Sequence, residues 1–144
     1  MNRLLTIALV LCVSTGFAQK SKMSFERLKA LKMSYITEKI GLTEAEESVF
    51  WEIYDAYEKK IYVDSRKKIK NLRKNFIKSK DSISNEEAYG VIQKINELEH
   101  IALELEAERD KELIQKFSAH KILKMHHAEY YFNREMLYKM KKKE

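Results

Sequence analysis

The chain has 144 residues, with 28 basic and 22 acidic side chains and a formal net charge of +6 at neutral pH. It has no proline, three glycines and a single cysteine near its start. One cysteine excludes an intramolecular disulfide framework, so packing alone must stabilise the fold. The length suits one domain of ordinary size, and no segment alternates like a half-buried strand, so the pattern predicts an all-α protein.

Residues 1–18 have the pattern of a secretory signal peptide. Arg3 provides a short positive start, an apolar run follows, and Gly16 and Ala18 occupy the −3 and −1 positions of a cleavage site. The run is shorter than the roughly 20 apolar residues that a membrane-spanning helix needs, and polar residues follow it directly. We therefore predict export and cleavage after Ala18.

Cys12 lies inside the apolar run and raises a lipoprotein anchor as the alternative. Leu11 precedes it, whereas a lipidated cysteine normally follows a small residue, so lipidation is not expected. The predicted mature chain, residues 19–144, is a single domain without cysteine. It keeps 27 basic residues against 22 acidic ones, a net charge of about +5. In an exported protein this excess favours acidic proteins or the anionic envelope surface rather than nucleic acid as partners.

The first mature helix is predicted over residues 24–39, where apolar residues recur at helical spacing. Gly41 then provides a left-handed C-terminal stop. Thr43 and Glu46 form a capping-box pattern, in which the threonine oxygen accepts an orphan amide and the glutamate reaches back. A second helix is expected to begin directly after this cap.

The second helix is predicted to continue to Ser79, a rod of roughly 55 Å. Its first half is aromatic, and Phe50, Tyr54, Tyr57 and Ile61 share one face. We expect them to form a buried seam together with Ile53. Its second half is strongly basic. Such a run is typical of a solvated helix face, and the alternative is a surface that binds acidic partners.

A third helix is predicted to begin after a short turn, at a second capping box formed by Ser84 and Glu87. It carries an apolar stripe and an acidic outer face, so it should pair antiparallel with the basic second helix. Exposed ion pairs contribute well under ~1 kcal/mol each and favour the register more than the stability. A last helix is predicted over residues 116–143, either continuous with the third or broken at Ser118.

The expected architecture is thus an elongated four-helix hairpin, with two long antiparallel helices and two shorter ones. Such a thin body exposes much apolar area, and spare tyrosines such as Tyr130 and Tyr131 lie near its end. We therefore expect a homodimer.

The segment ITEKIGLTEAEESVFWEIYDAYEKK, residues 36–60, resembles the exported Spy/CpxP-like proteins with the LTxxQ motif, especially the subset labelled sensor of ECF-type sigma factor. The matching residues are Leu42, Thr43 and Glu46, followed by the aromatic run. A second, weaker motif is represented by Phe117 and Ser118. Glu46 replaces the glutamine of the named motif and Phe117 a leucine, and both keep the physical role of a cap and an apolar plug.

The resemblance covers nearly all of the mature chain and implies a small periplasmic α-helical protein. The resemblance implies the properties of that family's best-known members. These are cradle-shaped dimers with a basic, partly apolar concave face, and they act as ATP-independent chaperones or as regulators of stress pathways. The departures from the motif weaken the transfer of activity from the best-known members.

No pattern of catalytic residues is present, and we expect neither an enzyme, a cofactor nor a small-molecule substrate. His120, His126 and His127 lack the i, i+4 spacing of a helical two-histidine metal site, so ordinary surface histidines are favoured over metal binding.

The remaining candidates for function are aromatic and basic side chains of the second helix. Tyrosine and tryptophan suit surfaces that bind many partners, because each combines a large apolar body with a polar tip. The candidate client-binding residues are Trp51, Tyr62, Arg66, Lys67, Lys70, Arg73 and Lys74.

Two functions stay open at this point. One is an envelope chaperone that holds unfolded or misfolded proteins. The other is an accessory regulator of an envelope-stress pathway, which would need a membrane-bound stress sensor as intermediary, because an ECF sigma factor is cytoplasmic.

Overall fold

The computed structural model describes residues 25–80 and 82–141, with side chains up to Lys139. The predicted signal peptide and its cleavage site lie outside these residues. The described chain is helical apart from short turns, which confirms the all-α prediction. Its elements are α1 (Phe25–Ile40), α2 (Glu44–Ile61), a π-helical turn (Tyr62–Arg66), α3 (Lys67–Ser79), α4 (Asn85–Ile114) and α5 (Ala119–Lys141).

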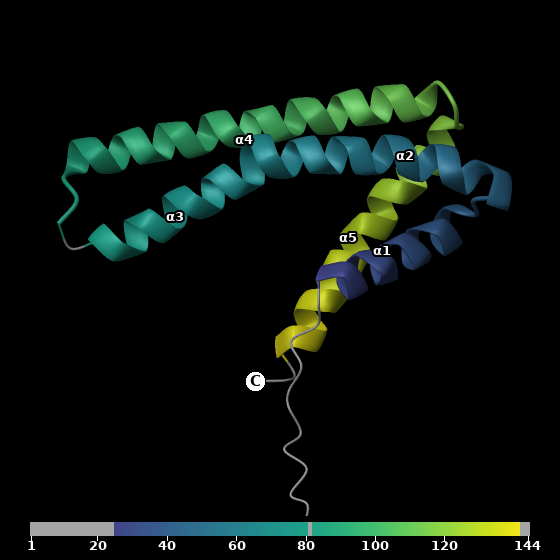
Figure 1. Cartoon of the computed structure of the whole chain (residues 1–144), viewed down its shortest axis with the longest axis horizontal. Coiled ribbons are helices and arrows are strands. Elements are labelled where there is room, and N and C mark those ends of the chain that lie inside the picture. The colour runs from purple at the N-terminus through teal and green to yellow at the C-terminus, as the bar shows by residue number, and fades with distance from the viewer. Residues whose placement is uncertain (1–24, 81, 142–144) are drawn as a thin grey trace, which may run out of the picture.

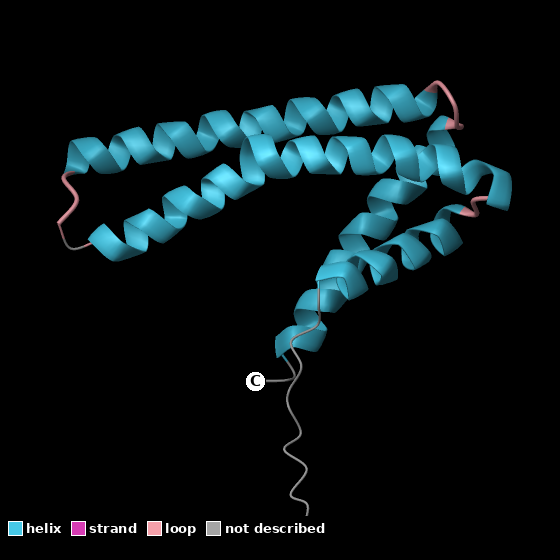
Figure 2. Cartoon of the chain, in the orientation of Figure 1, coloured by secondary structure: helices cyan, strands magenta, loops and turns pink. Residues whose placement is uncertain are grey.

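The helices form two arms that meet at an elbow (Figure 1). In the long arm, α2 and α3 run one way and α4 returns beside them. In the short arm, α1 lies against α5, and the pair leaves the long arm at an angle. Within the described residues, loops occur only at the bends between helices (Figure 2).

The predicted stop and cap between α1 and α2 are present. Gly41 has φ of 67°, and its amide donates to the carbonyl of Thr37 at 3.0 Å. The Thr43 amide donates to Glu46 Oε2 at 2.8 Å, and the same box recurs at the start of α4, where the Ser84 amide donates to Glu87 Oε2 at 2.8 Å. Local chemistry therefore sets where these helices begin.

The main hydrophobic core lies at the elbow, where both arms contribute. It takes apolar side chains from α1, α2, the end of α4, the turn after it and α5. Its buried members are Ile36, Ile40, Phe50, Trp51, Tyr54, Leu113, Phe117, Ile122, Met125 and Ala128. The Phe50 ring stacks on Tyr54 with centroids 5.9 Å apart and meets Phe117 edge-on at 5.5 Å. The predicted seam is thus buried at Phe50, Tyr54 and Ile61, whereas Ile53 and Tyr57 are only half-buried.

The outer end of the long arm packs more loosely than the sequence suggests. The π-helical turn inserts an extra residue in the helical register and bends the rod, so α3 leans away from α4 (Figure 1). Ile92, placed on the apolar stripe of α4, is 54% exposed, and Ile77 of α3 is 68% exposed. Ile69 is the one apolar side chain of α3 that is buried.

Candidate functional site

The two sequence motifs lie against each other at the elbow. Lys121, three residues after Ser118, reaches back to Glu46, with Nζ 2.6 Å from both carboxylate oxygens. The Lys121 amide is 3.3 Å from the Ser118 hydroxyl that begins α5. Phe117 inserts its ring beside Phe50. Glu46 therefore serves both as the cap of α2 and as an ion-pair partner of α5.

The electrostatics of Glu46 follow from these contacts. The hydrogen bond from Lys121, followed by the bond from the Thr43 amide, lowers the pKa of Glu46 from 4.5 to about 2. Glutamate in place of the motif's glutamine thus creates a charged link between the two motifs. The motif residues form a structural joint, because their polar groups are used by one another.

A groove runs along the outer half of the long arm, between α3 and α4. Its volume is about 920 Å³, and two rows of side chains from the π-helical turn and α3 line it, each row with a spacing of four residues. One row is Ser65, Ile69, Arg73 and Ile77, and the neighbouring row is Arg66, Lys70, Lys74 and Lys78. From α4 the groove is lined by Glu99, Ala102 and Leu103.

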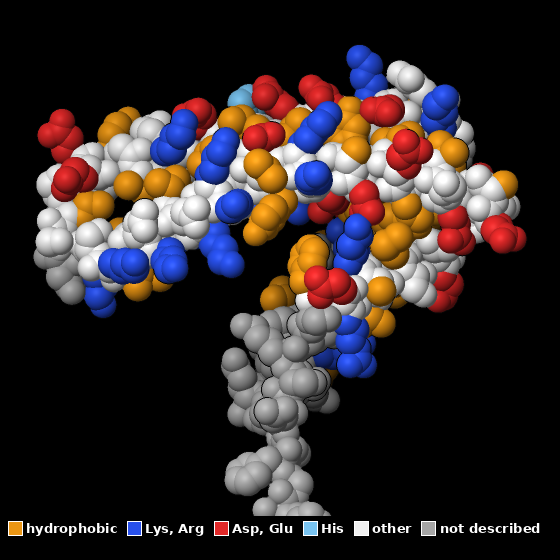
Figure 3. All heavy atoms as spheres, in the orientation of Figure 1, with side chains coloured by type: hydrophobic (Ala, Val, Ile, Leu, Met, Phe, Trp, Pro, Cys, Tyr) orange, Lys and Arg blue, Asp and Glu red, His pale blue; other side chains and the backbone are white. Residues whose placement is uncertain are grey.

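The cations of the groove differ in whether they are neutralised. Arg66 pairs with Glu58 at 3.1 Å and Glu106 at 3.2 Å, and Arg73 pairs with Glu99 at 3.6 Å. Lys70, Lys74 and Lys78 form no ion pair with any residue that the structure describes. Figure 3 shows Lys and Arg side chains gathered along α3, with hydrophobic side chains between them. The groove therefore combines uncompensated positive charge with apolar surface.

Most of the predicted basic candidates line this groove. Arg66, Lys70, Arg73 and Lys74 do so, whereas Lys67 is exposed on α3 outside it. Lys78 was not among the candidates, although it continues the same four-residue spacing. That spacing would have identified it in the sequence.

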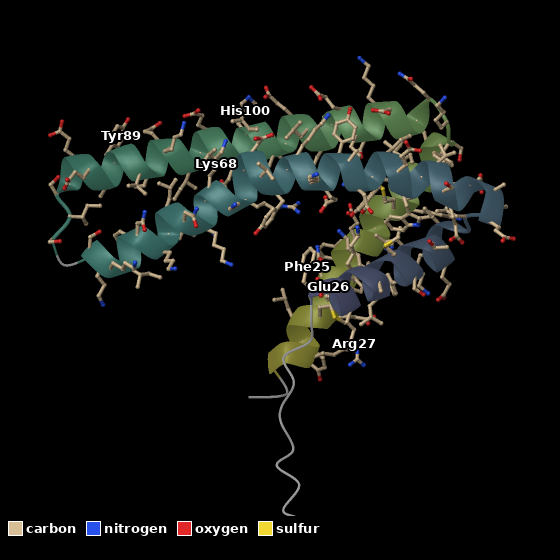
Figure 4. The ribbon with its side chains drawn as sticks, in the orientation of Figure 1. Phe25, Glu26, Arg27, Lys68, Tyr89 and His100 are labelled. Atoms are coloured by element: carbon tan, nitrogen blue, oxygen red, sulfur yellow. The ribbon has the colours of Figure 1, made fainter. Side chains whose placement is uncertain are left out.

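The two aromatic candidates lie elsewhere, in a second pocket of about 630 Å³ inside the elbow. Trp51 is only 8% exposed, and its Nε1 donates to Thr37 Oγ1 at 3.1 Å, so much of its surface holds α2 against α1. Tyr62 is half exposed at the pocket's edge. Phe25, at the N-terminal end of α1, also lines this pocket (Figure 4).

A buried ionic network beneath the elbow pocket was missed by the sequence analysis. Arg109 of α4 is 2% exposed and lies 3.1 Å from Asp110, 3.5 Å from Glu58 and 3.6 Å from Glu129. Its guanidinium lies over the Tyr54 ring, 5.0 Å from the centroid. The available signal was its position on the apolar stripe of α4, four residues before Leu113.

Glu129 of α5 links this network to α1 and α2. Lys32 lies 3.2 Å from it, and the Tyr54 hydroxyl donates to it. Burial alone would raise the pKa of Glu129, but the charges of Arg109 and Lys32 outweigh burial and hold that pKa below its ordinary value. Burial, reinforced by the Glu129 charge, raises the pKa of Tyr54 well above its ordinary value, so its hydroxyl stays a donor.

The histidine side chains contact different partners and do not form one site. His126 is hydrogen-bonded to Asp110 at 2.6 Å, the His127 ring packs on Tyr131 with centroids 4.4 Å apart, and His120 is exposed. His100 lies on the side of α4 away from α3 (Figure 4). Within residues 25–80 and 82–141, no three His, Cys, Asp or Glu side chains are grouped closely enough to hold a metal ion.

Comparison with known proteins adds no identification, because no family model, no curated protein and no solved structure matches the chain. Among the described residues, no helix is long and apolar enough to cross a membrane.

Proposed function

We propose that this protein is an exported, non-enzymatic envelope-stress protein of Spy/CpxP type that holds unfolded proteins without ATP. The observation that carries the proposal is the groove between α3 and α4, where Lys70, Lys74 and Lys78, which have no ion pair with a described residue, lie beside the apolar side chains of Ile69, Ile77 and Leu103. Positive charge speeds the capture of acidic chains, and apolar contact then retains them. The resemblance of the two motifs to that family points the same way.

The test is suppression of aggregation of a denatured acidic protein by the mature chain, at low and high salt. Suppression should weaken with salt, because exposed charges are screened beyond about 8–10 Å near physiological ionic strength. A variant with Lys70, Lys74 and Lys78 changed to Gln should suppress aggregation less. Its matched control changes Lys111, Lys116 and Lys124 to Gln, which removes the same charge from unpaired lysines of the described chain outside the groove.

Equal activity of the two triple variants would contradict the role of the groove and shift the site to the elbow pocket around Trp51 and Tyr62. A wild-type protein that fails to slow aggregation at several-fold molar excess would contradict the chaperone function. The alternative, an accessory regulator that acts through a membrane-bound stress sensor, would then be the favoured function.

We also propose that the protein is a homodimer. Leu123, Tyr130 and Leu137 follow one another at seven-residue spacing on α5 and are 68%, 61% and 60% exposed. Residues seven apart share a helix face, so they form an apolar seam suited to a two-fold contact with a second copy. Light scattering at micromolar concentration should give twice the chain mass, and changing Leu123 and Leu137 to Gln should give the single mass. A wild-type monomer would contradict the dimer.

A further inference from the structure

The groove between α3 and α4 and the pocket inside the elbow are neighbouring parts of one surface. Arg66, at the end of the π-helical turn, lines both of them. On the groove side, Lys70 lies one helical turn further on, about 6 Å along the axis. On the pocket side, Tyr62 lies four residues before Arg66. A single bound chain can therefore reach both sites within a few residues, because an extended chain spans about 3.3–3.6 Å per residue.

The two sites differ in how far their charges are neutralised. In the groove, Lys70, Lys74 and Lys78 have no ion pair with a described residue. In the elbow pocket, five of the six charged lining residues are in ion pairs, and only Lys59 has none with a described residue. These pairs are Lys29–Asp55 at 2.6 Å, Lys32–Glu129 at 3.2 Å and Arg66–Glu58 at 3.1 Å. An acidic run is therefore attracted mainly to the groove.

The elbow pocket instead suits large apolar side chains. Trp51, Tyr54 and Phe132 line it with buried rings, and Phe25 and Tyr62 line it with rings that are at least half exposed. Figure 3 shows hydrophobic side chains gathered in the inner corner of the elbow, between the two arms. An aromatic or aliphatic side chain that enters this corner covers the exposed rings and removes apolar surface from water.

We propose that the groove and the elbow pocket together bind one bipartite segment of a client, in which a short acidic run is directly followed or preceded by an apolar, aromatic-rich run. The acidic run lies over the groove lysines, and the apolar run enters the elbow pocket. This inference rests on the proposed function, since it names the part of an unfolded client that is held. It requires both sites to act on one chain, whereas the proposed function requires the groove alone.

The experiment measures the binding of capped, tryptophan-free peptides to the mature protein by fluorescence anisotropy, with a neutral fluorophore on each peptide. One peptide joins a short run of Glu directly to a short run of Phe and Leu. Two others are its separate halves, and a fourth alternates the same residues. We expect the joined peptide to bind about tenfold more tightly than either half and than the alternating peptide, because linkage makes the second contact intramolecular. A flexible Gly-Ser linker of about 20 residues between the halves should remove most of this gain, because the effective concentration falls with linker length.

Trp51 provides a readout of the elbow pocket. It is the only tryptophan of the chain and lines that pocket, so its emission responds directly to an occupant there. The joined peptide and the apolar half should change the Trp51 emission, whereas the acidic half should not. Binding of the acidic half should weaken with salt, and binding of the apolar half should not.

Variants assign the two sites. Changing Lys70, Lys74 and Lys78 to Gln should weaken the joined peptide about tenfold, to the affinity of the apolar half, and leave the apolar half unaffected. Changing Phe25 and Tyr62 to Ser should weaken the joined peptide to the affinity of the acidic half. Both rings are at least half exposed, so the core is left intact, and circular dichroism checks the fold. The triple variant at Lys111, Lys116 and Lys124 should bind like the wild type.

A joined peptide that binds no more tightly than its halves, or no more tightly than the alternating peptide, would overturn the inference. Unchanged Trp51 emission on binding of the joined peptide would overturn it too, as would loss of the apolar half in the triple variant of the groove. Suppression of aggregation without this discrimination between peptides would remove the inference and leave the proposed function standing. Discrimination without suppression of aggregation would instead remove the chaperone function and keep the bipartite peptide site.

Discussion

Replacing Arg109 by methionine should destabilise the fold by about 3 kcal/mol. Removing one partner of a buried ion pair typically costs about 3–5 kcal/mol, because the other charge stays buried without compensation. Here the three carboxylates around Arg109 each keep another partner, since Lys32 remains beside Glu129, Arg66 beside Glu58 and His126 beside Asp110. The lower end of the range is therefore expected, and methionine preserves most of the packing over Tyr54.

The assay is urea unfolding followed by circular dichroism at 222 nm, with Lys111→Met as the control. Lys111 is exposed on the same helix, so its replacement should change the free energy of unfolding by less than about 0.5 kcal/mol. The double variant Arg109→Met with Glu129→Gln should lose less than the sum of the single variants, by about 1–2 kcal/mol, because the two groups interact.

The same network gives a dependence on pH. The pKa of Glu129 is lowered in the folded state, so its stabilising contribution is present above the ordinary value of 4.5 and is lost as the pH falls through the lower folded pKa. Arg109→Met should reduce this loss. A cost of Arg109→Met below about 1 kcal/mol, or a gain in stability, would refute the reasoning, since a buried ion pair contributes little in some proteins.

Other changes have equally specific expected results in the same unfolding assay. Gly41→Ala should lower the free energy of unfolding by about 1 kcal/mol, because Gly41 has a φ of 67°. Gly90→Ala in α4 should raise it by about 1 kcal/mol, because an added Cβ there meets nothing within 4 Å. Effects of the same sign would contradict this reasoning. Ser65→Ala should gain about 1 kcal/mol, because the buried hydroxyl has no hydrogen-bond partner among the described residues, and a loss would show that it has one. Glu46→Gln should flatten the decline in stability between pH 4.5 and about 2. The Glu46 carboxylate stabilises the fold above its unfolded pKa, and this contribution is lost as the pH falls towards the lower folded pKa. An unchanged decline would mean that the contact with Lys121 does not form in solution.

Much of the fold was predictable because its signals are local. Gly41 can adopt the left-handed conformation at no steric cost, and the capping boxes at Thr43 and Ser84 act within four residues. The aromatic seam through Phe50 and Tyr54 followed from the helical period of 3.6 residues. These signals located the ends of the helices to within a few residues without knowledge of their partners.

The candidate groove was only partly predictable. The sequence shows that α3 is basic, but it does not show which lysines are neutralised, because the acidic partners come from α4 and from the end of α2. Arg66 is paired with Glu58 and Glu106, whereas Lys70 and Lys74 are unpaired among the described residues, and that difference depends on how far α3 leans from α4. The π-helical turn that causes the lean has no recognised sequence signature here.

The sequence by itself determined the helical class, the capped starts of α2 and α4, and the excess of positive charge on α3, because each depends on residues close together in the chain. It did not show that the predicted second helix is interrupted at Tyr62–Arg66. Only the tertiary structure decided that Arg109 is buried among carboxylates from three helices, that Lys121 joins the two motifs through Glu46, and that an open groove lies between α3 and α4. These features require the angle between two arms and the bend at the π-helical turn. Both are set by packing between residues far apart in the chain, and periodicity alone does not encode them.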